Sequence, residues 1–548
     1  MGTVFTRVRP ILAVACALAL HCVSMAQTLP HTMNILDQIP PGSPVPGSNY
    51  IQSIVVDSNA IWLGTGKGLS VSYNGGNTWN NYYNSPAFGT EEVADITIAH
   101  VPGNKIIIAP TFHIEEVNTG FQTQAVGVGT GFRYRFFYGA DTNWHIVPEP
   151  IDTNNTAGET IAYGSYSYSA LPVVVPEDNF IRNVAVTPSG NIFIAAFAGG
   201  LRESTDYGNT WKRILLPTDS IDYITPDSLK NGKPYFYSGL ALNVDNSYNQ
   251  RAFSIVALSD SEIFAGTSGG VNHSTDGGVS WRRYSHNNTP GISGSWIFSM
   301  AEQNVNGVPV LWASTILSAI DTTADSSNVP DTAIAYSRDD GADWHSIADF
   351  HGRITNNFSF WGNYVYLATD TGLYSSCDGG QTWVLKTLFK DTLRREQVLD
   401  PTVFSAAVNP SDSMLFIGTY DGLVTAHETG CYESYYDVTQ VSAALSTPTS
   451  TYAYPNPFSP AQGETRIHYR VDNPGVIRTG QVTVEIFDFS MNPVRTVIRN
   501  APRSNDEEQN EIWDGLTDNG ARTANGVYFY SVRVDNGDRR WGKILVIQ

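Results

Sequence analysis

An eight-residue phrase recurs along this chain and constrains its fold more than any other feature. Each copy has Ser, then Asp or Asn two residues later, Gly two residues beyond that, and a closing Trp. Self-similarity of this kind is the signature of a repeat architecture. The copies are Ser72, Asn74, Gly76 and Trp79; Ser204, Asp206, Gly208 and Trp211; Ser274, Asp276, Gly278 and Trp281; Ser337, Asp339, Gly341 and Trp344; and Ser376, Asp378, Gly380 and Trp383.

One complete repeat unit spans residues 53–83 and reads as four short β segments separated by turns. Four strands in about 30 residues is the size of one propeller blade. A related strand phrase returns at Ile61, Ile192, Ile263, Val365 and Leu415, the last without the turn, and a degraded turn precedes Trp144. We therefore expect an all-β fold, a single β-propeller of about seven four-stranded blades over residues 49–436, with six and eight as alternatives.

The repeated turn has a physical role that needs no ligand. Ser274 and Asp276 can accept hydrogen bonds from amides one or two residues on, around a turn that Gly277 and Gly278 permit. Trp281 then begins the next strand and can pack against the neighbouring sheet. A calcium loop would need several carboxylates, and SYNGGNTW has none. We predict a structural turn, with neither a metal nor a cofactor.

These copies resemble the Asp-box, or bacterial neuraminidase repeat. That repeat occurs in sialidases, in xyloglucan-degrading glycosidases, in sortilin-type receptors and in photosystem assembly propellers. The resemblance implies a propeller whose boxes lie on the outer part of each blade, away from a central ligand site. It implies no particular function, because these families share the blade and little else.

The repeats end near residue 436, and a Ser/Thr-rich linker follows at 437–451. Alternating segments such as TGQVTVEIFDF and GVYFYSVRV predict a small β-sandwich over residues 452–548. The phrases YPNPFSP, IWDGLTDNGARTANGVYFYSVRV and WGKILVIQ resemble an immunoglobulin-like domain related to flagellar hook-capping proteins. That module commonly sorts cargo for type IX secretion, which would make the secretion machinery a partner. Ser490, Met491 and Asn492 fill a turn that usually carries Gly.

Residues 1–26 read as a secretory signal cleaved after Ala26, followed by a lead-in segment at 27–48. No later apolar stretch approaches the length of a membrane span. Removing two arginines leaves 30 basic against 52 acidic residues, or −22, which disfavours nucleic acid and anionic membranes as partners. We expect a secreted or outer-surface protein. Two cysteines remain after the signal, Cys377 and Cys431. Either they form a disulfide, or Cys377 simply occupies the variable second position of its repeat.

Two enzyme hypotheses follow from the resemblance. A sialidase clamps its substrate with arginines that begin before the first repeat, whereas the first arginine after the signal is Arg133. A xyloglucan-degrading glycosidase needs two carboxylates flanking the scissile bond. Glu91, Glu92 and Asp95, or Glu115 and Glu116, lie near predicted strand ends, where solvated loop charge is the competing interpretation.

The remaining features favour binding over catalysis. The tract YGSYSYS places Tyr163, Tyr166 and Tyr168 in a predicted insertion, and exposed tyrosines contact sugars or proteins at low entropic cost. Motifs for zinc hydrolysis, phosphate loops and serine nucleophiles are absent from the sequence. We expect a non-catalytic binding or scaffold propeller for glycan or protein, with a xyloglucanase-like glycoside hydrolase as the alternative.

Overall fold

The computed structural model describes residues 42–547 and divides them into two units. Outside the description lie residues 119–122, 140, 153–158, 227–228, 231–232, 235–246, 322–331, 348–349, 351, 392–395, 399, 429–433, 442–449, 462, 472–478 and 505–508. The first unit runs to Val441 and the second begins at Ser442. The described residues are almost entirely β-structure, with one short 3-10 helix, η2 (Tyr248–Gln250).

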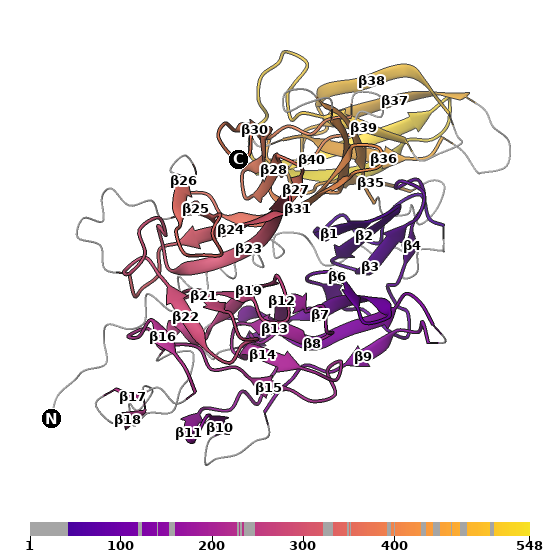
Figure 1. Cartoon of the computed structure of the whole chain (residues 1–548). Helices are drawn as coiled ribbons and strands as arrows, with labels where there is room; N and C mark the ends of the chain where they lie inside the picture. Colours follow the sequence, from indigo (N-terminus) through magenta and orange to yellow (C-terminus); the bar gives the residue numbers. More distant parts are fainter. Residues whose placement is uncertain are drawn as a thin grey trace. The chain divides into compact units, whose positions relative to one another are not determined.

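The first unit is built from consecutive antiparallel sheets, which we number in chain order (Figure 1). Sheet 1 has β1 (Ile51–Asp57), β2 (Ala60–Thr65), β3 (Gly68–Ser72) and β4 (Asn80–Asn81). Sheet 2 has β5 (Glu92–Val93), β6 (Thr97–Val101), β7 (Asn104–Asn118), β8 (Thr123–Phe136) and β9 (His145–Val147). Sheet 3 has β12 (Ile181–Val186), β13 (Ile192–Ala196), β14 (Gly200–Ser204) and β15 (Lys212–Arg213).

The same order repeats in the rest of the unit. Sheet 4 has β19 (Ala252–Ala257), β20 (Ile263–Thr267), β21 (Gly270–Ser274), β22 (Trp281–Tyr284) and a fifth strand, β16 (Tyr223–Ile224). Sheet 5 has β23 (Trp296–Val305), β24 (Val308–Ile316), β25 (Thr332–Ser337) and β26 (His345–Ile347). Sheet 6 has β27 (Thr355–Trp361), β28 (Tyr364–Thr369), β29 (Gly372–Ser376) and β30 (Val384–Lys386). Sheet 7 has β31 (Val403–Asn409), β32 (Met414–Thr419), β33 (Leu423–Glu428) and β34 (Ser434–Thr439).

The first strands of neighbouring sheets contact one another and close a ring. Contacts join β1 to β6, β6 and β7 to β12, β12 to β19, β19 to β23, β23 to β27, β27 to β31, and β31 back to β1. Each chain segment therefore makes one sheet and passes to the next around a common axis. This closed ring of antiparallel sheets is the β-propeller arrangement that the repeats predict. Its last strand ends at Thr439, three residues beyond the expected boundary at 436.

Between the sheets, the closing Trp of one sheet packs on a large buried side chain of the sheet before it. Trp383 meets Trp312 edge to face with ring centroids 6.4 Å apart, and Trp211 meets Phe132 in the same way at 6.1 Å. Such aromatic contacts add to the burial of apolar area. The other three pairs share a core cluster: Trp79 with Phe416, Trp281 with Phe193, and Trp344 with Phe264.

The repeated turn lies between the third and fourth strand of its sheet, on the side away from the axis. In all five copies the Ser hydroxyl donates to the Asp or Asn side chain at 2.8–2.9 Å. The same hydroxyl accepts from the Gly amide four residues on at 2.8–2.9 Å. The Asp or Asn oxygen accepts from the amide four residues beyond it at 2.7–2.9 Å. The side chains thus reach further than the one or two residues expected.

We predict that Asp276→Ala lowers the free energy of unfolding by about 1 kcal/mol, because the amides of Val279 and Ser280 lose their acceptor. The matched control is Asp276→Asn, since Asn74 fills this position in sheet 1 with the same geometry. Urea unfolding monitored by tryptophan fluorescence measures both. Equal losses in the two variants would show that charge, rather than the acceptor, matters.

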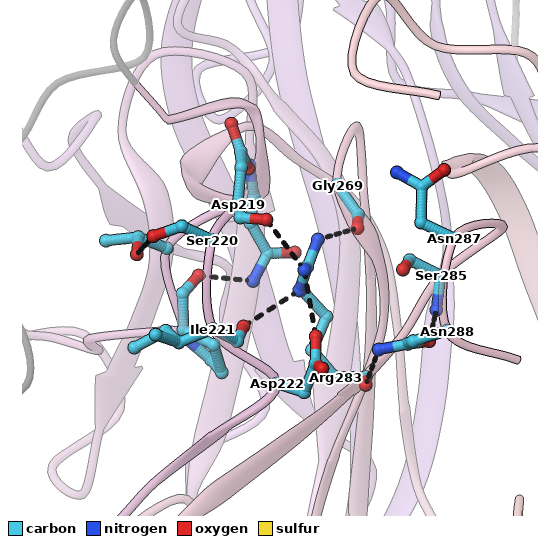
Figure 2. Close-up of polar contacts among 12 residues, drawn as sticks. Asp219, Ser220, Ile221, Asp222, Gly269, Arg283, Ser285, Asn287 and Asn288 are labelled. Carbon is cyan, nitrogen blue, oxygen red and sulfur yellow. Dashed lines mark hydrogen bonds and ion pairs between the residues drawn. The ribbon is translucent and has the colours of Figure 1, made fainter. Parts of the chain in front are cut away.

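A buried arginine fixes the insertion between sheets 3 and 4. Arg283 is 4% exposed, and Figure 2 shows its guanidinium surrounded by backbone oxygens. Its Nε donates to the Ile221 carbonyl at 3.1 Å and its Nη1 to the Gly269 carbonyl at 3.0 Å. Its Nη2 donates to the Asp219 carbonyl at 2.8 Å and to the Asp222 carboxylate at 3.0 Å. One side chain thereby ties the start of the insertion to sheet 4.

The end of the same insertion is held by Asp219. Its carboxylate accepts from the amides of Tyr248 and Asn249, at 2.8 and 2.9 Å, where η2 begins. Asn249 in turn donates to the Pro217 carbonyl at 2.7 Å. Both ends of the insertion therefore meet at one polar cluster beside sheet 4.

Replacing Arg283 by Ala should lower the free energy of unfolding by about 2–5 kcal/mol, because it leaves the carbonyl groups of Asp219, Ile221 and Gly269 without this donor and each buried unsatisfied group costs about 1–3 kcal/mol. Arg282→Ala is the control, since Arg282 is exposed on the same strand. Denaturant titration together with limited proteolysis of residues 217–250 measures the effect. A loss no larger than that of Arg282→Ala would contradict this account of the cluster.

The second unit consists of two sheets on one core. The three-stranded sheet has β35 (Thr451–Tyr454), β36 (Thr465–Tyr469) and β39 (Gln509–Trp513). The four-stranded sheet has the order β38 (Pro493–Ser504), β37 (Thr479–Phe487), β40 (Gly526–Val534) and β41 (Arg540–Val546). Both sheets contribute to one buried cluster that includes Tyr469, Val484, Trp513, Tyr530 and Ile544.

The turn at Ser490, Met491 and Asn492 has a backbone conformation that favours Gly. Met491 has φ of 65°, and the Asp488 carboxylate accepts from the Asn492 amide at 2.8 Å. The turn is therefore left-handed at a residue other than Gly, and Asp488 stabilises it.

Candidate functional site

A bulge near the start of the first strand brings side chains together at one end of the ring. In six sheets the pairing of first and second strand skips one residue, namely Gln52, Arg182, Phe253, Phe298, Asn356 and Phe404. A bulge re-aims the side chain of the unpaired residue. In sheet 2 the first strand is interrupted instead, between β5 and β6, where Asp95 lies. All but Phe253 remain partly exposed.

Hydrogen bonds at this level join neighbouring first strands. Asp95 accepts from Ser53 of sheet 1 at 3.3 Å and from Asn183 of sheet 3 at 2.8 Å. Asn183 also accepts from the Ile255 amide of sheet 4 at 2.7 Å. Similar bonds join Ser299 to Thr355, Asn356 to Val403, and the Ile54 amide to Ser405. We call this set the bulge belt; it fixes the six bulges and Asp95 at one level of the ring.

An arginine among aromatic rings occupies the belt on sheets 3 to 5. The guanidinium carbon of Arg182 lies 4.8 Å from the ring centre of Phe180, 5.4 Å from that of Phe253 and 6.0 Å from that of Phe298. Guanidinium groups on aromatic faces gain electrostatic stabilisation and are held in place. Between sheets 4 and 5 the belt itself is aromatic, with Phe253 and Trp296 centroids 5.3 Å apart.

The acidic residues singled out from the sequence lie on sheet 2 at the same end of the ring. Glu92 accepts from Gln52 at 3.0 Å, and burial raises its pKa to about 8. Burial also raises the pKa of Asp95 to about 6, against the opposing effect of its hydrogen bonds to Asn183 and Ser53. At neutral pH Glu92 is therefore mainly protonated and can donate a hydrogen bond. Glu92 therefore contacts the first bulged residue and Asp95 belongs to the belt, whereas Glu91 contacts His113 and Thr130.

Strands β7 and β8 extend past this end of the ring as a hairpin, which we call the arm (residues 113–118 and 123–128). The first strand of sheet 2 begins at Glu92, which pairs with Phe112, whereas β7 continues to Asn118 and, among the described strands, pairs there with β8. His113 at the base of the arm contacts Glu91 at 3.0 Å and Glu115 at 2.9 Å. Burial alone would lower the pKa of His113, but the two carboxylates raise it. Sequence reasoning missed His113, although its spacing of two from Glu115 predicts a shared strand face.

Alternating glycines in β8 make room for a buried carboxyl beside the arm. A Cβ on Gly129 would lie 2.6 Å from Glu149 Oε2, and a Cβ on Gly127 would lie 2.8 Å from the Phe180 ring. Glu149 is 8% exposed and accepts from the Gly131 amide at 3.1 Å. Burial raises its pKa to about 8, with Gly131 and Arg202 opposing the shift. The sequence GVGTG therefore seats Glu149 and Phe180 against sheet 2.

Glu149 should make the protein less stable as pH rises. Its folded pKa of about 8 exceeds the unfolded value of about 4.5, so its contribution is complete below pH 4.5 and is lost towards pH 8. Glu149→Gln should reduce the pH slope of unfolding free energy in this window by up to about 1.4 kcal/mol per pH unit. Urea titrations at pH 5 to 8 measure the slope, with exposed Glu116→Gln as control. Unchanged slopes in Glu149→Gln would show that Glu149 titrates normally.

The tyrosines expected in a contact loop belong instead to a packed hairpin, β10 (Glu159–Tyr163) and β11 (Tyr166–Ala170). Tyr168 is 8% exposed and joins the core of sheets 3 and 4, with Tyr163 and Tyr166 packed against it. Tyr163 donates through its hydroxyl to the Val279 carbonyl in the turn of sheet 4, at 2.7 Å. Tyr168 is therefore a core residue, because Ile214, Leu215 and Leu216 cover the hairpin.

The other predicted residues are placed as follows. The repeated turns lie on the outer strands, away from the bulge belt. Glu115 and Glu116 lie on the arm and are exposed. Cys377 is disulfide-bonded, while Cys431 and the signal segment with Ala26 lie outside the described residues.

Two searches of the described residues bear on binding chemistry. No three acidic, histidine or cysteine side chains there form a group that could hold a metal ion. No helix in that part of the chain is long and apolar enough to cross a membrane.

Comparison with known proteins gives structural likenesses only. No family model and no curated sequence matches the chain. An ancestral GH74 enzyme has 15% identity and a TM-score of 0.45, covering 93% of this chain, which spans 63% of that enzyme. PorZ, a surface component of the type IX secretion system of Porphyromonas gingivalis, has 13% identity and a TM-score of 0.24, covering 91% and 75%. The β-propeller domain of Doa1 has 8% identity and a TM-score of 0.38, covering 72% and 98%. Likenesses at this level do not assign the chain to any of these families.

Proposed function

We propose that this chain is an exported, surface-exposed propeller that binds a protein or glycan ligand without catalysis, at the bulge end of its ring. The observation that carries the proposal is the set of bulges, which places Gln52, Arg182, Phe298, Asn356 and Phe404 at the same level of their first strands, near one end of the ring. Rigid aromatic and amide groups held in place by a scaffold bind ligands with little loss of entropy.

The carboxylates at this end support binding over catalysis because each has an intramolecular partner. Glu92 is held by Gln52 and Asp95 by Ser53 and Asn183. Glu91 accepts from Thr130 at 3.1 Å and contacts His113. Side chains engaged in this way stabilise the belt and the arm.

Glycoside hydrolysis is the second candidate, and one observation favours it. Burial raises the pKa of Glu92 to about 8, which suits a general acid, and Glu91 is a second carboxyl group next to it in the sequence. In that case Glu92 would protonate the leaving group.

Export is part of the same proposal. We take the ring as seven blades with Asp-box turns, preceded by a cleaved signal at residues 1–26. We take residues 452–548 as an immunoglobulin-like sorting domain recognised by type IX secretion machinery, on the basis of the sequence phrases. The two sheets of the second unit, which share one core, support a sandwich.

The test is a glycan and peptide array probed with the mature chain, residues 27–548, together with a reducing-sugar assay on xyloglucan. Phe404→Ala and Phe298→Ala should each weaken binding to the best array ligand at least tenfold. Tyr435→Ala is the control, because Tyr435 is 80% exposed on an outer strand.

Binding that is insensitive to both Phe variants would place the ligand elsewhere and overturn the proposed site. Release of reducing sugar that falls at least 100-fold in Glu92→Gln would establish the hydrolase alternative in its place.

A further inference from the structure

We propose that the open edge of the arm binds an extended basic peptide as an added β-strand. This inference goes beyond the proposed function, because it names a second surface, the arm, and the class of partner that this surface binds. An open strand edge presents unpaired amides and carbonyls, and peptide ligands commonly bind by adding a strand to such an edge.

The edge is open on the side of the arm that continues the line of the first strand. On the side towards the arm, the pairing of β5 with β7 ends at Glu92, the first residue of β5, which lies opposite Phe112. Beyond it, the backbone pairing recorded for His113–Asn118 among the described residues is with β8. The open edge of β7 in the arm therefore lies on the same side of β7 as β5. This is the side of sheet 2 that is nearer the axis of the ring.

The pleat identifies the backbone groups on this edge. The Ala94 amide donates to the Pro110 carbonyl at 3.1 Å, so Pro110 faces the first strand. The backbone amide and carbonyl groups of successive residues point to alternate sides of a strand. Those of Ile114 and Glu116 therefore point to the same side as the carbonyl group of Pro110. Both residues are beyond the end of β5, so their amides and carbonyls can accept a further strand.

The negative charge of the arm indicates that the added strand is basic. Residues 84–132 contain five acidic side chains and one lysine, Lys105, which is paired with Asp57 at 2.6 Å. Glu115 and Glu116 project from opposite faces of the arm, and the Glu115 side chain is 54% exposed. Acidic residues on an edge repel a second copy of the same edge. A strand with lysine or arginine on both faces would instead pair with both glutamates.

Binding is tested with the labelled peptide Ac-Thr-Val-Lys-Lys-Val-Thr-NH2 and the mature full-length protein. We expect saturable binding that weakens at least tenfold when Glu-Glu replaces Lys-Lys. We expect a similar loss in the protein variant E115Q/E116Q, whereas Asp343→Asn, an exposed acid on the outer turn of sheet 5, should bind normally.

Two further peptides test strand addition itself. One is N-methylated at residues 1, 3 and 5 and the other at 2, 4 and 6. Only one alternate set of amides faces the arm, so one peptide should lose at least tenfold in affinity and the other should bind normally. Hydrogen exchange of the Ile114 and Glu116 amides should slow when the unmodified peptide is bound.

Equal affinity of the two methylated peptides, or no binding of the parent peptide, would overturn this inference. If the array ligand still binds and depends on Phe404, the proposed function stands and only the peptide inference fails. If the array yields no ligand while the peptide binds the arm as described, the ring site fails and the edge remains.

Discussion

Hydrogen bonds between neighbouring first strands hold the ring together at one level. Each sheet is a run of local hairpins whose apolar faces are buried only against its neighbours, so the ring depends on what joins one sheet to the next. The bulge belt does this with Asp95 and Asn183 bonding across three sheet boundaries. Because the belt residues of the six bulged sheets lie at the bulge or within two residues of it, the interaction that closes the ring also fixes the position of the bulges.

The outer and inner strands of each sheet have different structural roles. On the outer strands the repeated turn and its Trp satisfy local polar groups and fill the space between sheets. On the inner strands the side chains differ from sheet to sheet, from Gln52 to Arg182 to Phe404. The repeated turns of the outer strands keep the fold constant, while the side chains of the inner strands vary in chemistry. This division is expected of a scaffold that carries a site.

This division explains what could be predicted from the sequence. The turns were predictable because their hydrogen bonds span only four residues and the same residue types recur in each copy. Three of the six bulged residues are Phe and the others are Gln, Arg and Asn, so no single residue type marks a bulge. The belt also joins positions as distant in sequence as Ile54 and Ser405, which no local pattern can reveal. Tyr168 was misplaced because alternation with serine is typical of an exposed segment, whereas its cover comes from Leu215 and Leu216 some 45 residues later. Glu91, Glu92 and Asp95 were found through their charge, but the raised pKa values of Glu92 and Asp95 depend on burial that only the fold creates.

The self-contained turns also leave one position in each copy without a part in the turn. The residue after the Ser is Tyr73, Thr205, Thr275, Arg338 or Cys377, so aromatic, hydroxyl, basic and thiol side chains all occur there. The outer strands of five sheets therefore carry a position whose chemistry differs while the turn keeps its hydrogen bonds. One of these positions already carries a covalent cross-link, since Cys377 is disulfide-bonded. A protein built in this way can acquire tethers or labels at its periphery while its axis evolves independently.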